Sequence, residues 1–162
     1  MNYATIKHYD IANGPGVRIS LFVSGCRRGC KGCFNQEAWD FNYGQEFTYK
    51  TITEISSTLE NPNITGLSIL GGDPFEPENR EAVTYLLDYV KMFYPYKDVW
   101  VWTGYLYEDI KNLEVMQYID VLVDGPFIND LKDLRLKWRG SSNQRIIDIK
   151  KSRESGEVIL IA

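Results

Sequence analysis

The amino-acid sequence predicts an α/β fold built from alternating strands and helices. Short apolar runs alternate with segments of helical spacing, which is typical of βα units and a mostly parallel sheet. The 162 residues suffice for one hydrophobic core and no linker or repeat divides them, so we expect a single domain over residues 1–162. A closed barrel of eight βα units needs about 250 residues, so about five or six strands are expected to form an open, partial (β/α) barrel.

Four apolar runs are predicted to be strands, and each ends in a loop that carries glycine. They cover residues 17–24, 66–72, 98–104 and 120–127, and their final loops read SGC, GGDP, WTG and VDGPF. Ligands of α/β sheets bind at the carboxyl ends of the strands. We therefore expect the four loops to lie on one rim and to form the binding site.

Three segments are predicted to be helices: residues 48–61, 77–95 and 107–119. The strongest signal is that of residues 77–95, because Pro77 suits a first helical turn and Pro95 lies beyond the end. Apolar residues at helical spacing mark the buried faces of the first two helices: Ile52, Ile55, Leu59, Val83, Leu86, Leu87 and Val90.

The net charge of −4 argues against broad nucleic-acid binding. The charge is uneven, because residues 131–153 hold eight lysines and arginines against two aspartates. Within this stretch we expect Trp138 and Arg139 to anchor a protein–protein interface, and a solvated basic tail is the alternative. No apolar run is long enough for a membrane span and no secretory signal opens the sequence, so we expect a cytoplasmic protein with reduced thiols.

All three cysteines of the chain lie in the stretch SGCRRGCKGCFNQ, with the spacing C-x3-C-x2-C. Three thiols are an odd number for disulfides and one short of a closed zinc site, although the single histidine, His8, leaves a Cys3His zinc site open. A 4Fe–4S cluster with three protein ligands and one open iron fits the count, and the spacing favours it over a zinc or incidental site. Glycines between the cysteines permit tight turns, and basic residues lie beside an anionic cluster: Gly25, Gly29, Gly32, Arg27, Arg28 and Lys31.

This cysteine spacing resembles that of the radical S-adenosylmethionine enzymes. The resemblance implies that Cys26, Cys30 and Cys33 bind the cluster, and that the amino and carboxylate groups of S-adenosylmethionine chelate the open iron. The usual family pattern has an aromatic residue directly before the third cysteine. Here Gly32 stands at that position and Phe34 follows Cys33, which is known within one branch of the family, and we expect these three residues to contact the cofactor.

The GGDPF stretch after the second predicted strand has two interpretations. By itself it reads as a plain turn leading to a helix. The resemblance implies instead a glycine-rich loop in which Gly71, Gly72, Asp73 and Pro74 hold the amino group of the methionine moiety. In the third loop, Thr103 is expected to face the ligand, whereas core packing is the expected role of Trp100 and Trp102.

Four further stretches narrow the resemblance to one branch: NGPGVR at 13–18, LFVSGC at 21–26, VWTGY at 101–105 and KWRGSSNQRIID at 137–148. Together with GGDP and VDGPF they look like the activating proteins of anaerobic ribonucleoside-triphosphate reductase. The resemblance implies an enzyme that reductively cleaves S-adenosylmethionine at a 4Fe–4S cluster. Its 5′-deoxyadenosyl radical would then generate a glycyl radical on the reductase.

The partners implied are the large subunit of the reductase and reduced flavodoxin or a similar electron donor, in a homodimer or a heterotetramer with the reductase. Three other functions stay open. One is activation of another glycyl-radical enzyme, such as pyruvate formate-lyase. A second is radical chemistry on a small molecule, such as that of a deazapurine synthase. The third is a metal-binding module without enzymatic activity.

Overall fold

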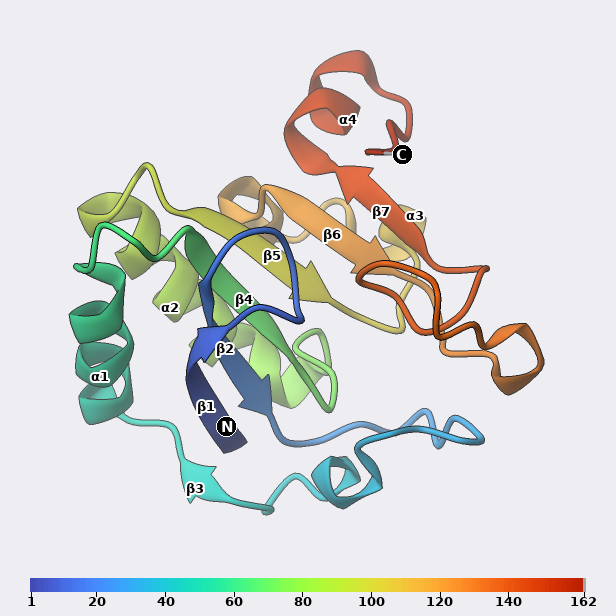
Figure 1. The fold of residues 1–162 in the computed structure, drawn as a ribbon, viewed down its shortest axis with the longest axis horizontal. Helices are drawn as coiled ribbons and strands as arrows, with labels where there is room; N and C mark the ends of the chain where they lie inside the picture. Colours follow the sequence, from blue (N-terminus) through green and yellow to red (C-terminus); the bar gives the residue numbers. More distant parts are fainter. Residues whose placement is uncertain (162) are drawn as a thin grey trace.

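The computed structural model describes residues 1–161 and places seven strands in one open sheet, in the order β3-β1-β2-β4-β5-β6-β7 (Figure 1). The strands are β1 (Asn2–Asp10), β2 (Arg18–Val23), β3 (Gln45–Glu46), β4 (Gly66–Gly71), β5 (Asp98–Trp102), β6 (Val121–Asp124) and β7 (Arg145–Asp148). The helices are α1 (Tyr49–Leu59), α2 (Pro77–Phe93), α3 (Tyr107–Ile110) and α4 (Ile149–Ser155), with 3-10 turns η1 (Gln36–Trp39), η2 (Glu114–Tyr118) and η3 (Asn129–Leu131).

The sheet is mixed, with parallel strands at its centre. Strands β2, β4, β5 and β6 pair in parallel, whereas β1 pairs antiparallel with β2 and β3, and β7 pairs antiparallel with β6. The α/β prediction of an open sheet is therefore confirmed, and all four predicted strands are present. The expected number of five or six strands is too low, because the sheet has seven. Strands β1, β3 and β7 lie toward its edges and are polar or short, so their sequences give a weak strand signal.

The main hydrophobic core lies between the parallel strands and the helices α1 and α2, which cover one face of the sheet (Figure 1). The predicted faces of both helices are buried there, including Ile55, Leu59, Leu86 and Val90. No helix among residues 1–161 is long and apolar enough to cross a membrane.

The predicted helix over residues 107–119 is wrong as a single element. The chain forms one turn, α3, then a bend, and then η2. The N–H of Leu113 donates to the carbonyl of Ile110 at 3.1 Å and the N–H of Met116 donates to that of Leu113 at 3.1 Å, so the hydrogen bonds have 3-10 spacing. Burial of Val115 and Met116 in the core outweighs the helical pattern.

A second, smaller cluster of apolar side chains lies apart from the helical core. It contains Trp100, Val121, Val123 and Ile146, with Trp102 and Trp138 packed against it. Neighbouring residues of β5, such as Val101, belong to the main core instead, because successive side chains of a strand point to opposite faces. The expectation of core packing is therefore confirmed for Trp100, whereas Trp102 is half-buried and lines the pocket described below.

The NGPGVR stretch has a structural explanation at the opposite end of the strands. Arg18 is fully buried, and its Nη2 lies 2.6 Å from Oδ1 of Asp98 while its Nε donates to Oγ of Ser68 at 2.7 Å. Because these residues begin or lie within β2, β4 and β5, one guanidinium joins three parallel strands. A side chain at Gly14 would lie 2.9 Å from Cδ of Arg18, so this glycine makes room for the arginine.

Candidate cluster and cofactor site

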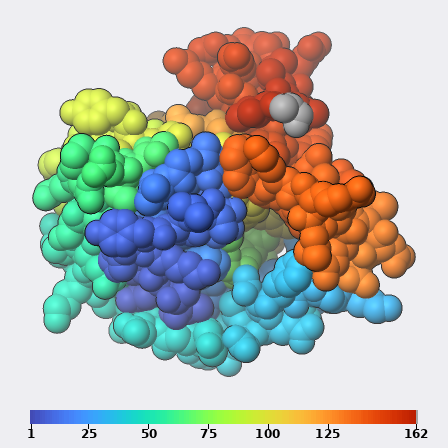
Figure 2. Space-filling model, in the orientation of Figure 1, coloured from blue at the N-terminus to red at the C-terminus, as the bar shows by residue number. Residues whose placement is uncertain are grey.

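The carboxyl ends of the four parallel strands meet at one pocket with a volume of about 620 Å³. Figure 2 shows this hollow between the blue N-terminal residues, the light-blue cysteine loop and the orange segment near residue 135. All four predicted loops contribute to its lining: Cys26, Cys30, Cys33, Gly71, Gly72, Asp73, Thr103, Gly104, Gly125 and Phe127. The prediction of a single rim is therefore confirmed.

The cysteines lie in a loop that runs from β2 to η1 without regular secondary structure. Two backbone hydrogen bonds tie its first residues to η1: the N–H of Gly25 donates to the carbonyl of Ala38 at 2.7 Å, and that of Cys26 donates to the carbonyl of Trp39 at 3.2 Å. All three thiols are free and half-buried. The loop thus presents three sulfur atoms to the same pocket.

The alternative of a Cys3His zinc site depended on His8, which lies beside helix α1 and away from the cysteines. Its Nδ1 is 2.7 Å from Oγ1 of Thr58 on α1, and its Nε2 is 3.8 Å from the carboxylate of Glu54 on the same helix. His8 does not line the pocket. A Cys3His zinc site that uses this loop therefore has no geometric support.

The donor set of the pocket fits an iron–sulfur cluster with three protein ligands. Thiolates are the ligands that iron–sulfur clusters prefer. Within residues 1–161, no three His, Cys, Asp and Glu side chains lie close enough together to hold a metal ion as they stand, so the thiols have to converge when a cluster binds. Gly29 and Gly32 have φ of 60° and 78°, and such glycines give the loop the freedom that this convergence needs.

Cys26 is the thiol with a clearly shifted pKa. Burial raises the pKa of Cys26 to about 11, and the charges of Asp73 and Glu76 add to the effect. The protein without metal therefore holds Cys26 as a protonated thiol near neutral pH. Binding of a metal has to displace that proton.

The glycine-rich loop after β4 packs tightly against the cysteine loop. The N–H of Gly72 donates to the carbonyl of Val23 at 2.7 Å, and the N–H of Asp73 donates to the carbonyl of Gly25 at 2.8 Å. A Cβ at Gly72 would lie 2.6 Å from the carbonyl oxygen of Gly25 and 2.8 Å from that of Ala38. The glycine is thus required for the approach of two loops, and contact of this backbone with a cofactor stays a prediction.

Asp73 lies at the centre of the rim and is almost fully buried. Its Oδ1 accepts hydrogen bonds from Oγ1 of Thr103 at 2.7 Å and from the N–H of Phe75 at 2.9 Å, and its Oδ2 accepts one from the N–H of Gly104 at 2.9 Å. Burial raises the pKa of Asp73 despite these donors. The Asp73 carboxylate thus joins the loop after β4 to the loop after β5. Holding these two loops in position is the role that its contacts indicate most clearly.

The structure brings most of the predicted cofactor residues to the pocket. Those that line it are Cys33, Phe34, Gly71, Gly72, Asp73 and Thr103. Gly32 and Pro74 do not line it. Pro74 is buried behind the loop, and Gly32 packs against the loop after β6, where an added Cβ would lie 3.0 Å from Cγ of Asn129.

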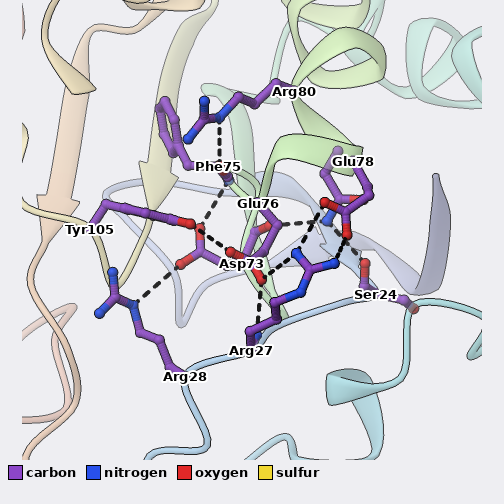
Figure 3. A network of polar contacts seen from close by, with 10 residues as sticks. Ser24, Arg27, Arg28, Asp73, Phe75, Glu76, Glu78, Arg80 and Tyr105 are labelled. Atoms are coloured by element: carbon purple, nitrogen blue, oxygen red, sulfur yellow. Dashed lines mark hydrogen bonds and ion pairs between the residues drawn. The ribbon is translucent and has the colours of Figure 1, made fainter. Parts of the chain in front are cut away.

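A polar network behind the rim links the cysteine loop to two other loops (Figure 3). Its centre is Glu76, which is buried and precedes α2. Oε2 of Glu76 accepts a 2.9 Å hydrogen bond from the backbone N–H of Arg27, and Oε1 accepts a 2.7 Å hydrogen bond from the hydroxyl of Tyr105. The Arg27 side chain is ion-paired with the exposed Glu78.

The segment between η3 and β7 forms one wall of the pocket. The rings of Trp138 and Trp100 meet edge-on with centroids 5.1 Å apart, and the carbonyl of Trp138 accepts a 2.7 Å hydrogen bond from Nε1 of Trp102. Arg139 donates to the carbonyl of Gln144 at 2.7 Å. Trp138 and Arg139 are thus held by contacts within this protein, and their role as anchors for a partner stays a prediction.

Named relatives share the sequence over most of its length. The anaerobic ribonucleoside-triphosphate reductase-activating protein of Enterobacteria phage T4 is 48% identical over 146 residues, which cover 90% of this chain and 93% of that protein. Proteins of the same name from Vibrio cholerae and Escherichia coli K12 are each 45% identical, over 90% and 89% of this chain and 97% and 96% of their own lengths. The chain belongs to this family of reductase-activating proteins.

A second comparison agrees with the geometry of the pocket. The family described as a 4Fe-4S single cluster domain matches residues 12–147. The matched region contains the cysteine loop and all four rim loops, and it ends within β7. All residues that line the pocket except Lys7 therefore lie in the part of the chain that matches this cluster domain.

Several contacts in and behind the pocket of this family member were not predicted from the sequence. Phe127 packs on Phe34 with ring centroids 5.7 Å apart, and Tyr105 and Glu76 form the network behind the rim. Tyr105 lay within a recognised motif, but nothing in the sequence indicated its partner. Glu76 precedes a helix, where acidic residues are common, so its burial gave no signal.

Proposed function

We propose that this protein activates an anaerobic ribonucleoside-triphosphate reductase by generating a glycyl radical on it, with a 4Fe–4S cluster and S-adenosylmethionine as cofactors. The observation that carries the proposal is the convergence of three thiols and a glycine-rich loop on one pocket, in a chain 43–48% identical to proteins named for this activity. We assign the whole chain, residues 1–162, to one radical S-adenosylmethionine domain.

When bound, the cluster and S-adenosylmethionine would supply the one-electron chemistry for removal of a hydrogen atom from a glycine Cα of the reductase. The residues of this chain hold, orient and shield the reactants. Cys26, Cys30 and Cys33 would hold the cluster, with the backbone at Gly71 and Gly72 beside it.

The remaining walls of the pocket suit the exclusion of water. Aromatic side chains from three segments line it: Phe34, Trp102, Phe127 and Trp138. The pocket has no histidine, and the oxygens of Asp73 are engaged in hydrogen bonds. A reaction that needs no general base is consistent with this lining.

The open sheet suits a macromolecular substrate. Its edge strands β3 and β7 do not pair with one another, so the sheet does not close around the pocket. A glycine-bearing loop of the large reductase subunit could approach from this open side. We propose that the electron comes from reduced flavodoxin or a similar donor, and that the reaction takes place in the cytoplasm, where thiols stay reduced.

Anaerobic reconstitution tests this proposal. The wild-type protein should bind about four irons and four sulfides per chain, as one 4Fe–4S cluster requires, and should form 5′-deoxyadenosine when dithionite and S-adenosylmethionine are added. Single Cys26→Ala, Cys30→Ala and Cys33→Ala variants should lose both properties. Full iron and sulfide content in all three variants would overturn the ligand assignment. Wild-type protein that binds the cofactor but never forms 5′-deoxyadenosine, even with the reductase present, would overturn the radical reaction.

A further inference from the structure

Arg28 lies in the pocket between the cysteine loop and the rest of the rim. Its guanidinium carbon is 4.6 Å from the centre of the Tyr105 ring, and its Nε is 4.0 Å from Oδ2 of Asp73. A side chain at Gly104 would collide with it, so that glycine leaves room for the arginine. Three contacts from the second and third rim loops therefore fix the guanidinium in place.

The fixed guanidinium still has donors to offer. Nε faces Asp73, whereas the terminal nitrogens Nη1 and Nη2 have no hydrogen-bond or ion-pair partner within residues 1–161. Figure 3 shows these two nitrogens directed away from Asp73. The side chain is 31% exposed, and its residue lines the pocket together with the three cysteines. An arginine held at one edge and open at the other is suited to bind a planar anion in two parallel hydrogen bonds.

The support for Arg28 extends one layer further. Tyr105, on which it stacks, donates its hydroxyl to Glu76, and the other oxygen of Glu76 accepts from the backbone of Arg27. The residue before Arg28 and the ring beneath it are thus held by the same buried carboxylate. Such an arrangement reduces the conformational entropy that an arginine loses when it binds a ligand.

The other cations of the pocket are placed differently. Arg139 donates to two backbone carbonyls, those of Ser142 and Gln144. Lys7 is exposed and lies 5.1 Å from the centre of the Phe22 ring, on strand β1 rather than beside the glycine-rich loop. Arg28 is the cation that contacts Asp73 and also has a free edge.

We propose that Arg28 binds the carboxylate of an amino-acid moiety, that of S-adenosylmethionine, in this pocket. The inference rests on the proposed function, which brings that cofactor to the cysteine loop. Arg28 then acts as a cofactor-binding residue that fixes the amino-acid end of the ligand next to Gly72 and Asp73. Its charge also offsets that of the buried carboxylate beside it.

The test compares two ligands that differ in the carboxylate. Affinities of the cluster-loaded protein for S-adenosylmethionine and for decarboxylated S-adenosylmethionine are measured by anaerobic equilibrium dialysis. Arg28→Gln should weaken binding of S-adenosylmethionine roughly 10- to 100-fold, the range expected for hydrogen bonds to a charged group. Its affinity for the decarboxylated ligand should stay within about threefold of that of the wild type, because no carboxylate is present to lose the contact. The affinity of Arg28→Lys for S-adenosylmethionine should lie between those of the wild type and Arg28→Gln. Lysine keeps the positive charge but cannot form the two parallel hydrogen bonds of a guanidinium.

Arg135→Gln is the matched control. It makes the same change at a side chain that is 91% exposed, is paired with Asp133 and does not line the pocket. Both affinities should be unchanged in this variant. Iron and sulfide content is measured for every protein before binding.

The outcomes separate the inference from the proposed function. If Arg28→Gln loses affinity equally for both ligands, or loses none for either, the carboxylate contact is overturned. Loss of the cluster in Arg28→Gln but not in Arg135→Gln would also overturn it, because Arg28 would then serve the cluster loop. If loaded wild-type protein binds neither ligand, the proposed function itself fails.

Discussion

The hydroxyl of Tyr105 donates a 2.7 Å hydrogen bond to Oε1 of Glu76, and this contact joins the loop after β5 to the residue that precedes α2. Burial and the hydrogen bond to Glu76 raise the pKa of Tyr105 to about 12. The hydroxyl therefore remains a donor at any pH at which the protein is used. Because the other oxygen of Glu76 binds the N–H of Arg27, one buried side chain fixes three loops of the pocket.

Replacing Glu76 should loosen the cysteine loop. Glu76→Ala leaves the Tyr105 hydroxyl and the Arg27 N–H without their acceptor, which should lower the free energy of unfolding by about 1–3 kcal/mol. The measurement is urea unfolding of the metal-free protein, followed by iron content after reconstitution. Glu78→Ala is the control, because Glu78 also binds Arg27 but is exposed. This variant should lower the free energy of unfolding by much less than Glu76→Ala does. Equal losses in the two variants would contradict a specific role of Glu76.

Gly72→Ala should destabilise the metal-free protein, before any cofactor is added. The new Cβ would meet the carbonyl oxygens of Gly25 and Ala38 at 2.6 and 2.8 Å, and these backbone atoms cannot turn away. We expect a loss of about 1–3 kcal/mol in unfolding free energy, as for other overpacked sites, together with reduced cluster content. Gly156→Asn is the control, because no atom lies within 4 Å of a Cβ there and asparagine tolerates its positive φ. A fully loaded Gly72→Ala protein of normal stability would show that the two loops do not need this close approach.

The raised pKa of Cys26 predicts slow alkylation of the metal-free protein. Only the thiolate reacts with iodoacetamide, so at pH 8 the reactive fraction of Cys26 should be small. Its rate should still be rising at pH 11, where about half of the thiol is ionised. Mass spectrometry of peptides after timed alkylation measures this rate for Cys26 by itself. A rate that levels off near pH 9 would mean that the cysteine loop exposes this thiol.

Trp138→Ala should destabilise the pocket wall. Loss of the edge-on contact with Trp100 should lower the unfolding free energy by about 2 kcal/mol, less than for a fully buried tryptophan. Leu134→Ala, which alters a side chain 84% exposed on the same segment, should change it by less than about 0.5 kcal/mol. Urea unfolding compares the two. A Trp138→Ala protein of normal stability that no longer binds the reductase would instead support the interpretation of Trp138 as a docking residue.

The central strands and the shared rim could be predicted because the apolar runs are short, strongly patterned and followed by glycine. Strand β1 could not, since only two of its nine residues are buried and its pairing with β2 comes from tertiary structure. The same limit applies to the site. The cysteines and GGDP are local motifs, whereas the contact of Glu76 with Tyr105 joins residues 29 positions apart.

The basic C-terminal stretch shows a further limit of reading charge from sequence. Arg145 is paired with Asp124 at 2.6 Å and also with Glu108, and Arg135 is paired with Asp133 at 3.0 Å. These acidic partners lie on other elements or on a turn, so the count of basic residues overstated the free positive charge.

The central claim is that this protein places a radical on a glycine of anaerobic ribonucleoside-triphosphate reductase. The most direct test is electron paramagnetic resonance of the reductase after anaerobic incubation with the cluster-loaded protein, S-adenosylmethionine and reduced flavodoxin. We predict a glycyl-radical signal with the wild-type protein and none with Cys26→Ala, Cys30→Ala or Cys33→Ala. A signal of full intensity with the cysteine variants, or a signal on pyruvate formate-lyase with none on the reductase, would contradict the account.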